Sequence, residues 1–259
     1  MFGAITKTYY AEKMGIDPAK IFSVSVMPCT AKKFERTRPD QHASGFADVD
    51  LVITTRELAR MLDQVGVDFA NLPDGEFDHP LGESTGAGVI FGATGGVMEA
   101  ALRTAVETLT GEELANLEFA EVRGTEGIKE ATYNVAGMDI NVAVASGLGN
   151  ARTLMDKIKS GEANYHFVEI MACPGGCVNG GGQPRHSGKI KNRFDIKAMR
   201  AGALYDIDAK RPVRKSHENE AVKKLYEEYL GEPGSHKAHE LLHTTYVKRT
   251  VNKPFGKED

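Results

Sequence analysis

The sequence predicts an α/β fold in which a mostly parallel sheet is flanked by helices and followed by a helical C-terminal segment. Short apolar runs rich in β-formers alternate with longer stretches of helical periodicity as far as Met171. Cysteine-bearing loops directly follow two of these runs, and sites in open α/β sheets gather beyond the carboxyl ends of the strands. From about Phe194 the pattern is helical only, so this segment is expected to wrap onto the main body.

The N-terminal elements follow from periodicity and capping residues. A helix is expected at Thr6–Met14, and a strand at Ile21–Met27, where apolar and polar residues alternate. Leu51–Thr54 is a second strand and leads into a helix at Arg56–Val65, with Thr55 as its N-cap.

Gly66–Gly92 carries prolines and several Asp and Gly residues, and it is expected to be a loop. A helix follows from near Gly95 to about Leu109, with Val97, Ala101 and Val106 toward the core. The remaining expected elements are the strands Leu117–Arg123, Met138–Ala145 and Phe167–Met171, the helix Asn150–Lys159, a helix beginning at Ser216 and a last short helix at about His236–Tyr246.

Composition excludes several classes of function. The 259 residues can bury a sizeable core, and 41% hydrophobic with 26% charged residues is ordinary for a soluble globular protein. The net charge is −4 and no basic stripe is present, so the sequence does not predict a nucleic-acid-binding surface. No apolar run approaches the roughly 18 residues of a membrane span, and Met1–Lys7 lacks the layout of a signal peptide. Cytoplasm is the expected location.

The chain has three cysteines, Cys29, Cys173 and Cys177, a poor basis for a disulfide framework. A helical turn across the Pro-Gly-Gly spacer would put the Cβ atoms of Cys173 and Cys177 about 5–6 Å apart. Two thiolates so placed could hold neighbouring irons of one cluster, with Cys29 as a third ligand, while a 4Fe–4S cubane needs four. Spacing alone leaves two alternatives open: a structural zinc site completed by a histidine such as His186, and buried cysteines without a ligand role.

Three stretches of the chain resemble those of iron-only (FeFe) hydrogenases. Val26–Glu35 resembles the second signature of this family, Met-Pro-Cys-x-x-Lys-x-x-Glu, and Glu169–Pro184 resembles the third signature nearly residue for residue. Phe91–Ala100 is similar to the glycine-rich segment that lines the cofactor cavity. The C-terminal segment, including Ala203–Asp206 and His236–His243, is similar to the small-subunit portion fused in many of these enzymes. The resemblance covers essentially the whole chain and implies the C-terminal lobe of the catalytic domain.

The resemblance assigns ligand roles to the cysteines. Cys29, Cys173 and Cys177 correspond to three of the four ligands of a 4Fe–4S cubane. Cys177 also corresponds to the thiolate that joins the cubane to a 2Fe subcluster carrying CO, CN and dithiolate ligands, and the two parts together form the H-cluster. Lys32 matches the lysine that hydrogen-bonds a cyanide ligand, a role that suits a compact cation. Without the motif, Lys32 would be read as a solvated surface residue.

Four further residues match positions around the diiron site. Met27 and Met171 correspond to methionines packed against it, where a soft and polarizable side chain fills an irregular cavity. Taken alone, each methionine would be read as ordinary core. Phe91 and Gly92 correspond to positions of the cavity wall, where glycine permits close backbone approach.

The family's first signature, Thr-Ser-Cys-Cys/Ser-Pro-x-Trp, is not found in this sequence. In the family it carries the fourth cubane thiolate and a cysteine that relays protons. We therefore expect a missing N-terminal part of the catalytic domain to supply the fourth thiolate. Met1 aligns with a position inside that domain, which predicts a truncated reading frame, a fragment or one chain of a split enzyme.

The implied activity is that of an oxidoreductase of anaerobic hydrogen metabolism, which interconverts protons and H2 with electrons from ferredoxin or a similar carrier. H-cluster maturation proteins are further expected partners. The alternatives are a non-catalytic homologue resembling iron–sulfur assembly factors, against which Lys32 and Met171 argue, and a hydrogen-sensing hydrogenase of low turnover. The expected organisation is a catalytic part at 1–192, a small-subunit-like helical segment at 193–250 and a polar tail at 251–259.

Overall fold

The computed structural model describes residues 1–247, which form two compact units. The first unit comprises Met1–Val24, Lys33–Leu51 and the chain from Leu225 onward, and the second comprises Ser25–Lys32 and Val52–Lys224. None of the helices in residues 1–247 is long and apolar enough to cross a membrane. The expected polar tail at 251–259 lies outside the described residues, and the expected domain boundaries stay a prediction.

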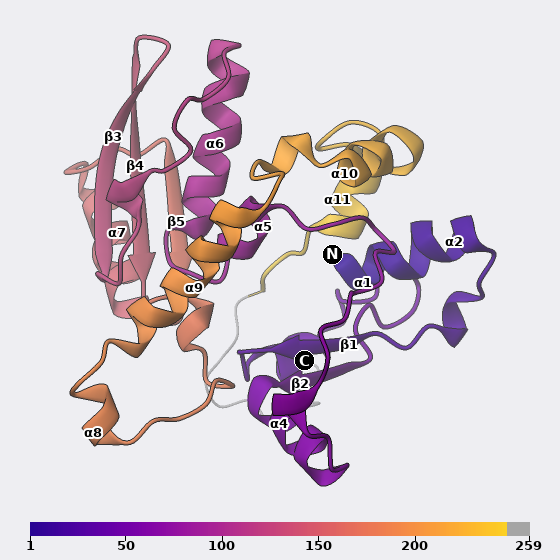
Figure 1. Ribbon diagram of the computed structural model, residues 1–259. Coiled ribbons are helices and arrows are strands. Elements are labelled where there is room, and N and C mark those ends of the chain that lie inside the picture. Colours follow the sequence, from indigo (N-terminus) through magenta and orange to yellow (C-terminus); the bar gives the residue numbers. More distant parts are fainter. Residues whose placement is uncertain (248–259) are drawn as a thin grey trace. The chain divides into compact units, whose positions relative to one another are not determined.

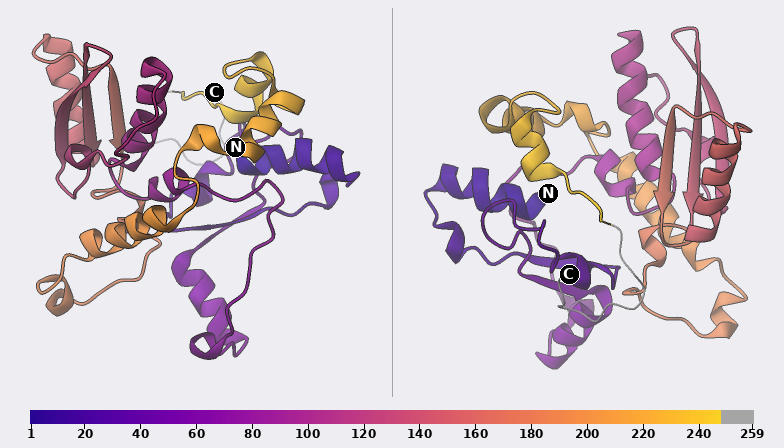
Figure 2. Two further views of the ribbon diagram at one scale, coloured as in Figure 1. Left: turned by 45° about the horizontal axis from the view of Figure 1, so that its top comes forward. Right: turned by 180° about the vertical axis from the view of Figure 1, so that it is seen from behind.

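The second unit contains a mixed three-stranded sheet in the order β3-β4-β5. The strands are β3 (Ile128–Val135), β4 (Met138–Ser146) and β5 (Phe167–Met171). β3 pairs with β4 in antiparallel fashion, and β4 pairs with β5 in parallel. Helix α6 (Gly96–Thr110) covers one face of the sheet and helix α7 (Leu148–Ser160) covers the other (Figures 1 and 2). The predicted α/β class is confirmed.

The two faces of β4 build two separate parts of the core. Val142 and Val144 pack with Met98 and Leu102 of α6, while Ala143 and Ala145 pack with Leu154 of α7; Phe119 and Val122 complete the first cluster. Successive side chains of a strand point to opposite faces, which explains this alternation. A strand covered on both faces reads as a continuous apolar run.

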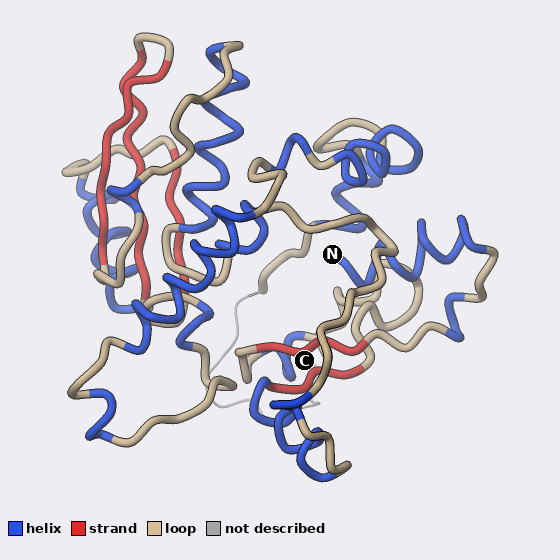
Figure 3. The backbone as a smooth tube through the Cα atoms, viewed as in Figure 1, coloured by secondary structure: helices blue, strands red, loops and turns tan. Residues whose placement is uncertain are grey.

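A two-stranded sheet pairs β1 (Val24–Met27) with β2 (Leu51–Thr54), as the red strands of Figure 3 show. Helix α4 (Thr55–Gln64) follows β2 directly. Thr54 caps it, because its side chain accepts from the N–H of Glu57 while the Glu57 carboxylate accepts from the N–H of Thr54. This reciprocal capping box places the N-cap one residue before the predicted Thr55.

Helix α9 (Ile196–Lys210) packs on the short helix α5 (Gly86–Ile90). The backbone after α9 also holds α5, because the N–H of Gly86 donates to the carbonyl of Val213 at 2.9 Å. The remaining helices of the second unit are the 3-10 turns Phe69–Asn71, Ala120–Val122, Cys177–Asn179 and Ser216–Glu218, the short helix α8 (Gly188–Lys191) and α10 (Glu220–Leu225), of which Leu225 belongs to the first unit.

A buried ion cluster joins α6 to α9. The guanidinium of Arg103 donates to Asp208 at 2.8 and 2.9 Å and to Glu99 at 2.7 Å, and all three residues are 0% exposed. Arg214 and Arg123 add further donors to the two carboxylates. Burial alone would raise the pKa of Asp208, but the hydrogen bonds from Arg103 and Arg214 outweigh it and hold this pKa below its usual value.

The first unit is helical. The N-terminal helix runs through α1 (Phe2–Ile5), a π-helical turn at Thr6–Tyr10 and α2 (Ala11–Met14), and it ends at Gly15 in the left-handed conformation. The other helices are α3 (Lys32–Glu35, of which Lys32 belongs to the second unit), a π-helical turn at Tyr226–Leu230, α11 (His236–Leu242) and the 3-10 turn Pro18–Lys20. The buried Lys7 holds this unit together through Asp50 at 2.6 Å.

Several predicted elements are wrong. Leu117–Arg123 is not a strand: its centre is a 3-10 turn, and Phe119 and Val122 are apolar because they pack onto α6. β3 and α9 were not predicted, and α5 lies inside the expected loop Gly66–Gly92. In α6 the buried apolar side chains are Met98, Ala100 and Leu102, whereas the predicted Val97 and Ala101 are only partly buried. The predicted Val106 does pack against the core.

Candidate metal centre

Cys173 and Cys177 lie on either side of a tight turn that follows β5. The N–H of Gly176 donates to the carbonyl of Cys173 at 2.9 Å, with Pro174 and Gly175 at the corner of the turn. Gly175 and Gly176 have φ values of +83° and +93°, which favour glycine. The spacer is therefore a β-turn and not the helical turn that the spacing suggested, and Cys177 begins a 3-10 turn.

The glycine segment, Gly92–Thr94, packs directly on this turn. The N–H of Thr94 donates to the carbonyl of Gly175 at 3.2 Å, and the N–H of Val178 donates to the carbonyl of Gly92 at 2.9 Å. A Cβ atom on Gly176 would lie 2.6 Å from the backbone nitrogen of Thr94. Only glycine fits this contact, so the turn and the glycine segment have a fixed register.

The loop that carries Cys29 meets the same region. The N–H of Gly182 donates to the carbonyl of Pro28 at 2.8 Å. A Cβ on Gly182 would lie 2.9 Å from the carbonyl carbon of Pro28, and one on Gly180 would overlap the Pro28 carbonyl oxygen. The residue before Cys29 is thus held against the residues that follow Cys177. The two loops come from different sheets, after β1 and after β5, and not from one sheet edge as expected.

The three thiols act on one another electrostatically. Burial raises the pKa of the Cys177 thiol, and the charges of Cys173 and Cys29 raise it further. The ammonium of Lys32 acts on the same thiol in the opposite direction and lowers its pKa. All three cysteines are half-buried and none is in a disulfide. Metal binding would have to displace the thiol proton, so affinity should rise with pH.

The spacing of the sulfurs disfavours a zinc site. Two thiolates on one zinc ion lie at most about 4.6 Å apart, because each Zn–S bond is about 2.3 Å. Within residues 1–247, the one set of three Cys, His or carboxylate ligand atoms within 4.8 Å of one another is Glu107, His217 and Glu218. In that set the ammonium of Lys215 bridges the carboxylates of Glu107 and Glu218 at 2.9 Å each. The three cysteine sulfurs do not all lie within 4.8 Å of one another, so one zinc ion could not bind all three as they stand.

The other predicted site residues fall into two groups. Met27 ends β1 and Met171 ends β5, so each lies two residues before a cysteine, and both are half-buried. Lys32 is half-buried at the start of α3. Phe91 is 44% exposed and borders an apolar groove along α6, with Val97 and Ala101 among its other walls.

Gly92 makes a close approach, but to a side chain of the C-terminal segment. A Cβ on Gly92 would lie 2.7 Å from Leu204 of α9. Its glycine is therefore explained by packing against α9 and by the hydrogen bond from Val178. A role of Phe91 and Gly92 in a cavity wall stays a prediction.

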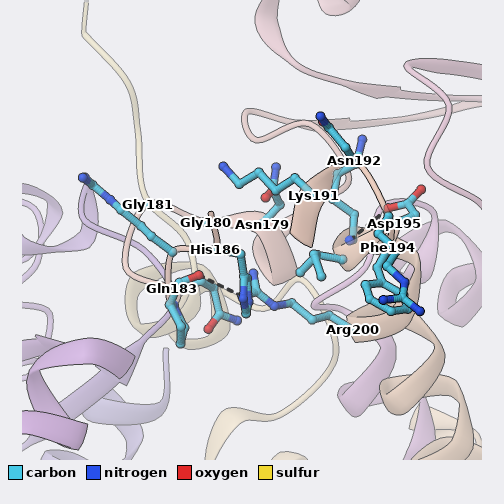
Figure 4. A pocket seen from close by; sticks show the side chains of 15 residues that line it. Asn179, Gly180, Gly181, Gln183, His186, Lys191, Asn192, Phe194, Asp195 and Arg200 are labelled. Atoms are coloured by element: carbon cyan, nitrogen blue, oxygen red, sulfur yellow. Dashed lines mark hydrogen bonds between the residues drawn. The ribbon is translucent and has the colours of Figure 1, made fainter. Parts of the chain in front are cut away.

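Arg200 of α9 supports the residues after Cys177, a role that no motif in the sequence indicates. Its guanidinium donates to the carbonyl of Val178 at 2.9 Å and to that of Pro184 at 3.0 Å. The side chain reaches toward His186, with 3.3 Å between the nitrogens, in a cavity of about 680 Å³ (Figure 4). His186, the histidine of the zinc alternative, is thus paired with an arginine.

The residues present fit three corners of a cubane. The donor set is three thiols, and the loops around them approach so closely that Gly176, Gly180 and Gly182 leave no room for a side chain. In addition, the hydroxyl of Thr94 is buried and has no hydrogen-bond partner among the described residues. A buried hydroxyl without a hydrogen-bond partner lowers the stability of the fold, and a cluster sulfur next to the glycine segment would accept a hydrogen bond from it.

Comparison with known proteins agrees with this geometry. Residues 1–181 match the family described as iron only hydrogenase large subunit, C-terminal domain, and residues 194–249 match the iron hydrogenase small subunit. The NADP-reducing hydrogenase subunit HndD of Solidesulfovibrio fructosivorans is 53% identical over 249 residues, which cover 96% of this chain and 42% of that protein. Iron hydrogenase 1 of Clostridium pasteurianum is 50% identical over 248 residues, 96% of this chain and 43% of that protein. The chain thus spans less than half the length of these relatives.

A solved structure and a second class of relative complete the comparison. A variant of the apo [FeFe]-hydrogenase HydA1 from Chlamydomonas reinhardtii matches with a TM-score of 0.78 at 46% identity, over 95% of this chain and 68% of that chain. A cytosolic Fe-S cluster assembly factor of Xenopus tropicalis is 33% identical over 253 residues, 95% of this chain and 52% of that protein. The higher identities favour the hydrogenases. The chain belongs to the iron-only hydrogenase family.

Proposed function

We propose that this chain is the part of an iron-only hydrogenase that supplies three thiolates to the H-cluster and helps to interconvert protons, electrons and H2. The observation that carries the proposal is the packing of two cysteine loops against each other, in which Gly182 is hydrogen-bonded to Pro28 and a side chain at Gly180 is excluded. Cys29, Cys173 and Cys177 would each hold one iron of a 4Fe–4S cubane. Cys177 would also bridge to the 2Fe subcluster with its CO, CN and dithiolate ligands.

The H-cluster, when bound, supplies the redox chemistry and the metal on which hydrogen reacts. The chain's own residues bind and orient it. Lys32 would donate a hydrogen bond to an anionic ligand of the 2Fe subcluster, since its ammonium already acts on the Cys177 sulfur. Met27 and Met171 would pack around that subcluster, and Phe91 and Gly92 would close its cavity toward solvent.

Further parts of the enzyme are implied by this proposal. A part of the catalytic domain outside residues 1–259 would supply the fourth cubane thiolate and the proton path. A ferredoxin or a similar carrier would exchange electrons with the cubane, and maturation proteins would deliver the 2Fe subcluster. A cytoplasmic location is part of the same proposal.

The first test is anaerobic reconstitution of the full chain with ferrous iron and sulfide, with 2-mercaptoethanol present to occupy the fourth corner. We expect about four irons per chain and the electron paramagnetic resonance signal of a reduced 4Fe–4S cluster. Cys29→Ser, Cys173→Ser and Cys177→Ser should each reduce the iron content several-fold. Retention of a full cluster by all three variants would contradict the proposal.

The second test separates a hydrogenase from an iron–sulfur assembly homologue. The chain is co-expressed with the N-terminal part of a hydrogenase and the maturation proteins, and infrared bands of CO and CN ligands are recorded. Lys32→Met should shift the CN bands, whereas the neighbouring Lys33→Met serves as the matched control. A cubane without these bands would indicate the assembly class, and bands with very low turnover would indicate a hydrogen sensor.

A further inference from the structure

We propose that Glu169 and Lys129 are positioning residues of the cluster: they fix the glycine segment against the cysteine turn, and their opposite charges tune the reduction potential of the cubane. The inference rests on the proposed function and deepens it. Neither residue belongs to the cysteine-bearing loops, and neither is a ligand. Both lie in the second unit, on β5 and β3.

Glu169 connects the strand that leads to Cys173 with the helix that follows the glycine segment. Its side chain lies on β5, two residues before Met171, and the residue is 6% exposed. One carboxylate oxygen accepts from the N–H of Gly95 at 2.7 Å, and the other accepts from the N–H of Met98 at 2.8 Å. A carboxylate at a helix N-terminus satisfies unpaired N–H groups and is stabilised by the helix dipole. Glu169 therefore ties the start of α6 to β5.

Lys129 holds the glycine segment from the same face of the sheet, since Lys129 and Glu169 both pair with Val144 of β4. Its ammonium donates to the carbonyl of Thr94 at 3.2 Å and to that of Gly124 at 3.0 Å, and the residue is 6% exposed. Burial lowers the pKa of Lys129 to about 8, while the Glu169 carboxylate raises it in part. At pH 7 the lysine is thus mostly charged, and its ammonium and the Glu169 carboxylate attract each other electrostatically.

These contacts form a closed path through the proposed site. The path runs from Glu169 to Gly95, then through Thr94 to Gly175, and back along the chain through Cys173 to β5. Gly95 cannot give way, because it has a φ of +91° and a Cβ there would overlap the carbonyl oxygen of Val122. The position of the glycine segment relative to the cysteine turn is therefore fixed by the Glu169 carboxylate.

Both charges lie next to the cysteine turn, because Glu169 accepts from Gly95 and the Lys129 ammonium donates to Thr94, and this segment packs on the turn. Reduction of a cubane adds one negative charge to the site. A buried carboxylate nearby disfavours the reduced state and a buried ammonium favours it, since charge interactions are strong in a poorly solvated interior.

The test is the midpoint potential of the reconstituted cluster of the full chain at pH 7, followed by electron paramagnetic resonance. Glu169→Gln should shift the potential upward, and Lys129→Met should shift it downward. The double variant should lie between the two, and Lys129→Arg, which keeps the charge, should restore the wild-type value. Glu169→Gln should also lose iron to a chelator several-fold faster, because one backbone N–H loses its acceptor.

The outcomes distinguish this inference from the proposed function. A wild-type chain that builds no cubane would overturn both. A wild-type cubane whose potential is unchanged in both single variants, or shifts in the same direction in both, would overturn this inference alone, since a merely structural role predicts no opposite signs. If Glu169→Gln does not fold, the comparison of Lys129→Met with Lys129→Arg decides. Glu162→Gln, at an exposed glutamate near β5, is the control.

Discussion

Gly182 donates its backbone N–H to the carbonyl oxygen of Pro28 at 2.8 Å, although the two residues are far apart in the sequence. This bond joins the loop that carries Cys29 to the loop that follows Cys177. The flanking glycines keep the approach possible, because a Cβ atom at Gly180 or Gly182 would meet the backbone of Pro28. The contact between the two loops thus depends on Gly180 and Gly182, which have no side chain that could bind a metal or react.

Gly180→Ala should separate the two cysteine loops. The added methyl group would overlap the Pro28 carbonyl oxygen, and overpacking of this kind costs about 1–3 kcal/mol. We expect a lower free energy of unfolding by this amount and a several-fold lower iron content after reconstitution. Gly188→Ala is the matched control, since nothing lies within 4 Å of a Cβ at that position. Equal iron contents in the two variants would argue against the loop contact.

Arg103→Met should destabilise the chain strongly. It would leave Asp208 and Glu99 buried with fewer donors, and breaking a buried ion pair from one side costs about 3–5 kcal/mol. Urea unfolding at pH 7 measures the loss. Lys157→Met, which removes a partly exposed bridge to Glu130, should change the free energy of unfolding by less than about 1 kcal/mol. Similar values for both variants would contradict the importance assigned to the buried cluster.

Lys129 should make stability depend on pH in the alkaline range. Its pKa is about 8 in the folded chain and about 10.4 in an unfolded one, so the unfolded state binds more protons between these values. The free energy of unfolding should therefore rise with pH over this window through Lys129, by up to about 3 kcal/mol. Denaturant unfolding of wild type and Lys129→Met at several pH values isolates this contribution as their difference. A difference that is constant from pH 7 to pH 10 would show that Lys129 titrates normally.

Thr54→Ala should weaken the start of α4. It removes the side chain that accepts from the N–H of Glu57, and loss of such a cap costs about 0.5–2 kcal/mol. Thermal unfolding followed by circular dichroism measures the effect. Thr55→Ala, at the N-cap that the sequence suggested, should be close to neutral. The reverse order of the two variants would move the helix start by one residue.

The elements that the sequence predicted well have strong local signals. Leu51–Thr54 and Phe167–Met171 are strands with the predicted bounds, because each is a short apolar run that ends at a capping residue or a cysteine loop. β3 was missed because it is an edge strand with polar residues such as Lys129, Glu130 and Asn134 among its apolar ones. β3 forms because it pairs with β4, and no local sequence pattern indicates such a pairing.

The sequence motifs predicted the proposed ligands, but they did not predict the residues that hold the ligand loops in position. The motifs name Cys29, Cys173, Cys177 and Lys32, and the structure brings their loops together in one unit. Glu169 gave one usable signal, a lone carboxylate within the apolar run Phe167–Met171. A buried charge needs a partner, and here the partners are backbone groups of α6, which lie more than seventy residues earlier in the chain.

Through the hydrogen bonds of Arg200, helix α9 helps to set the geometry of the loop that follows Cys177. The carbonyl groups of Val178 and Pro184, which follow Cys177 in the chain, receive their charged donor from α9, whose sequence matches the iron hydrogenase small subunit. Any event that displaces α9, such as cleavage in the stretch around α8 or exchange of the segment for a separate polypeptide, would leave those carbonyls without that donor. The segment therefore supports the turn that we propose binds the cluster, and its loss should first lower the affinity of that turn for iron.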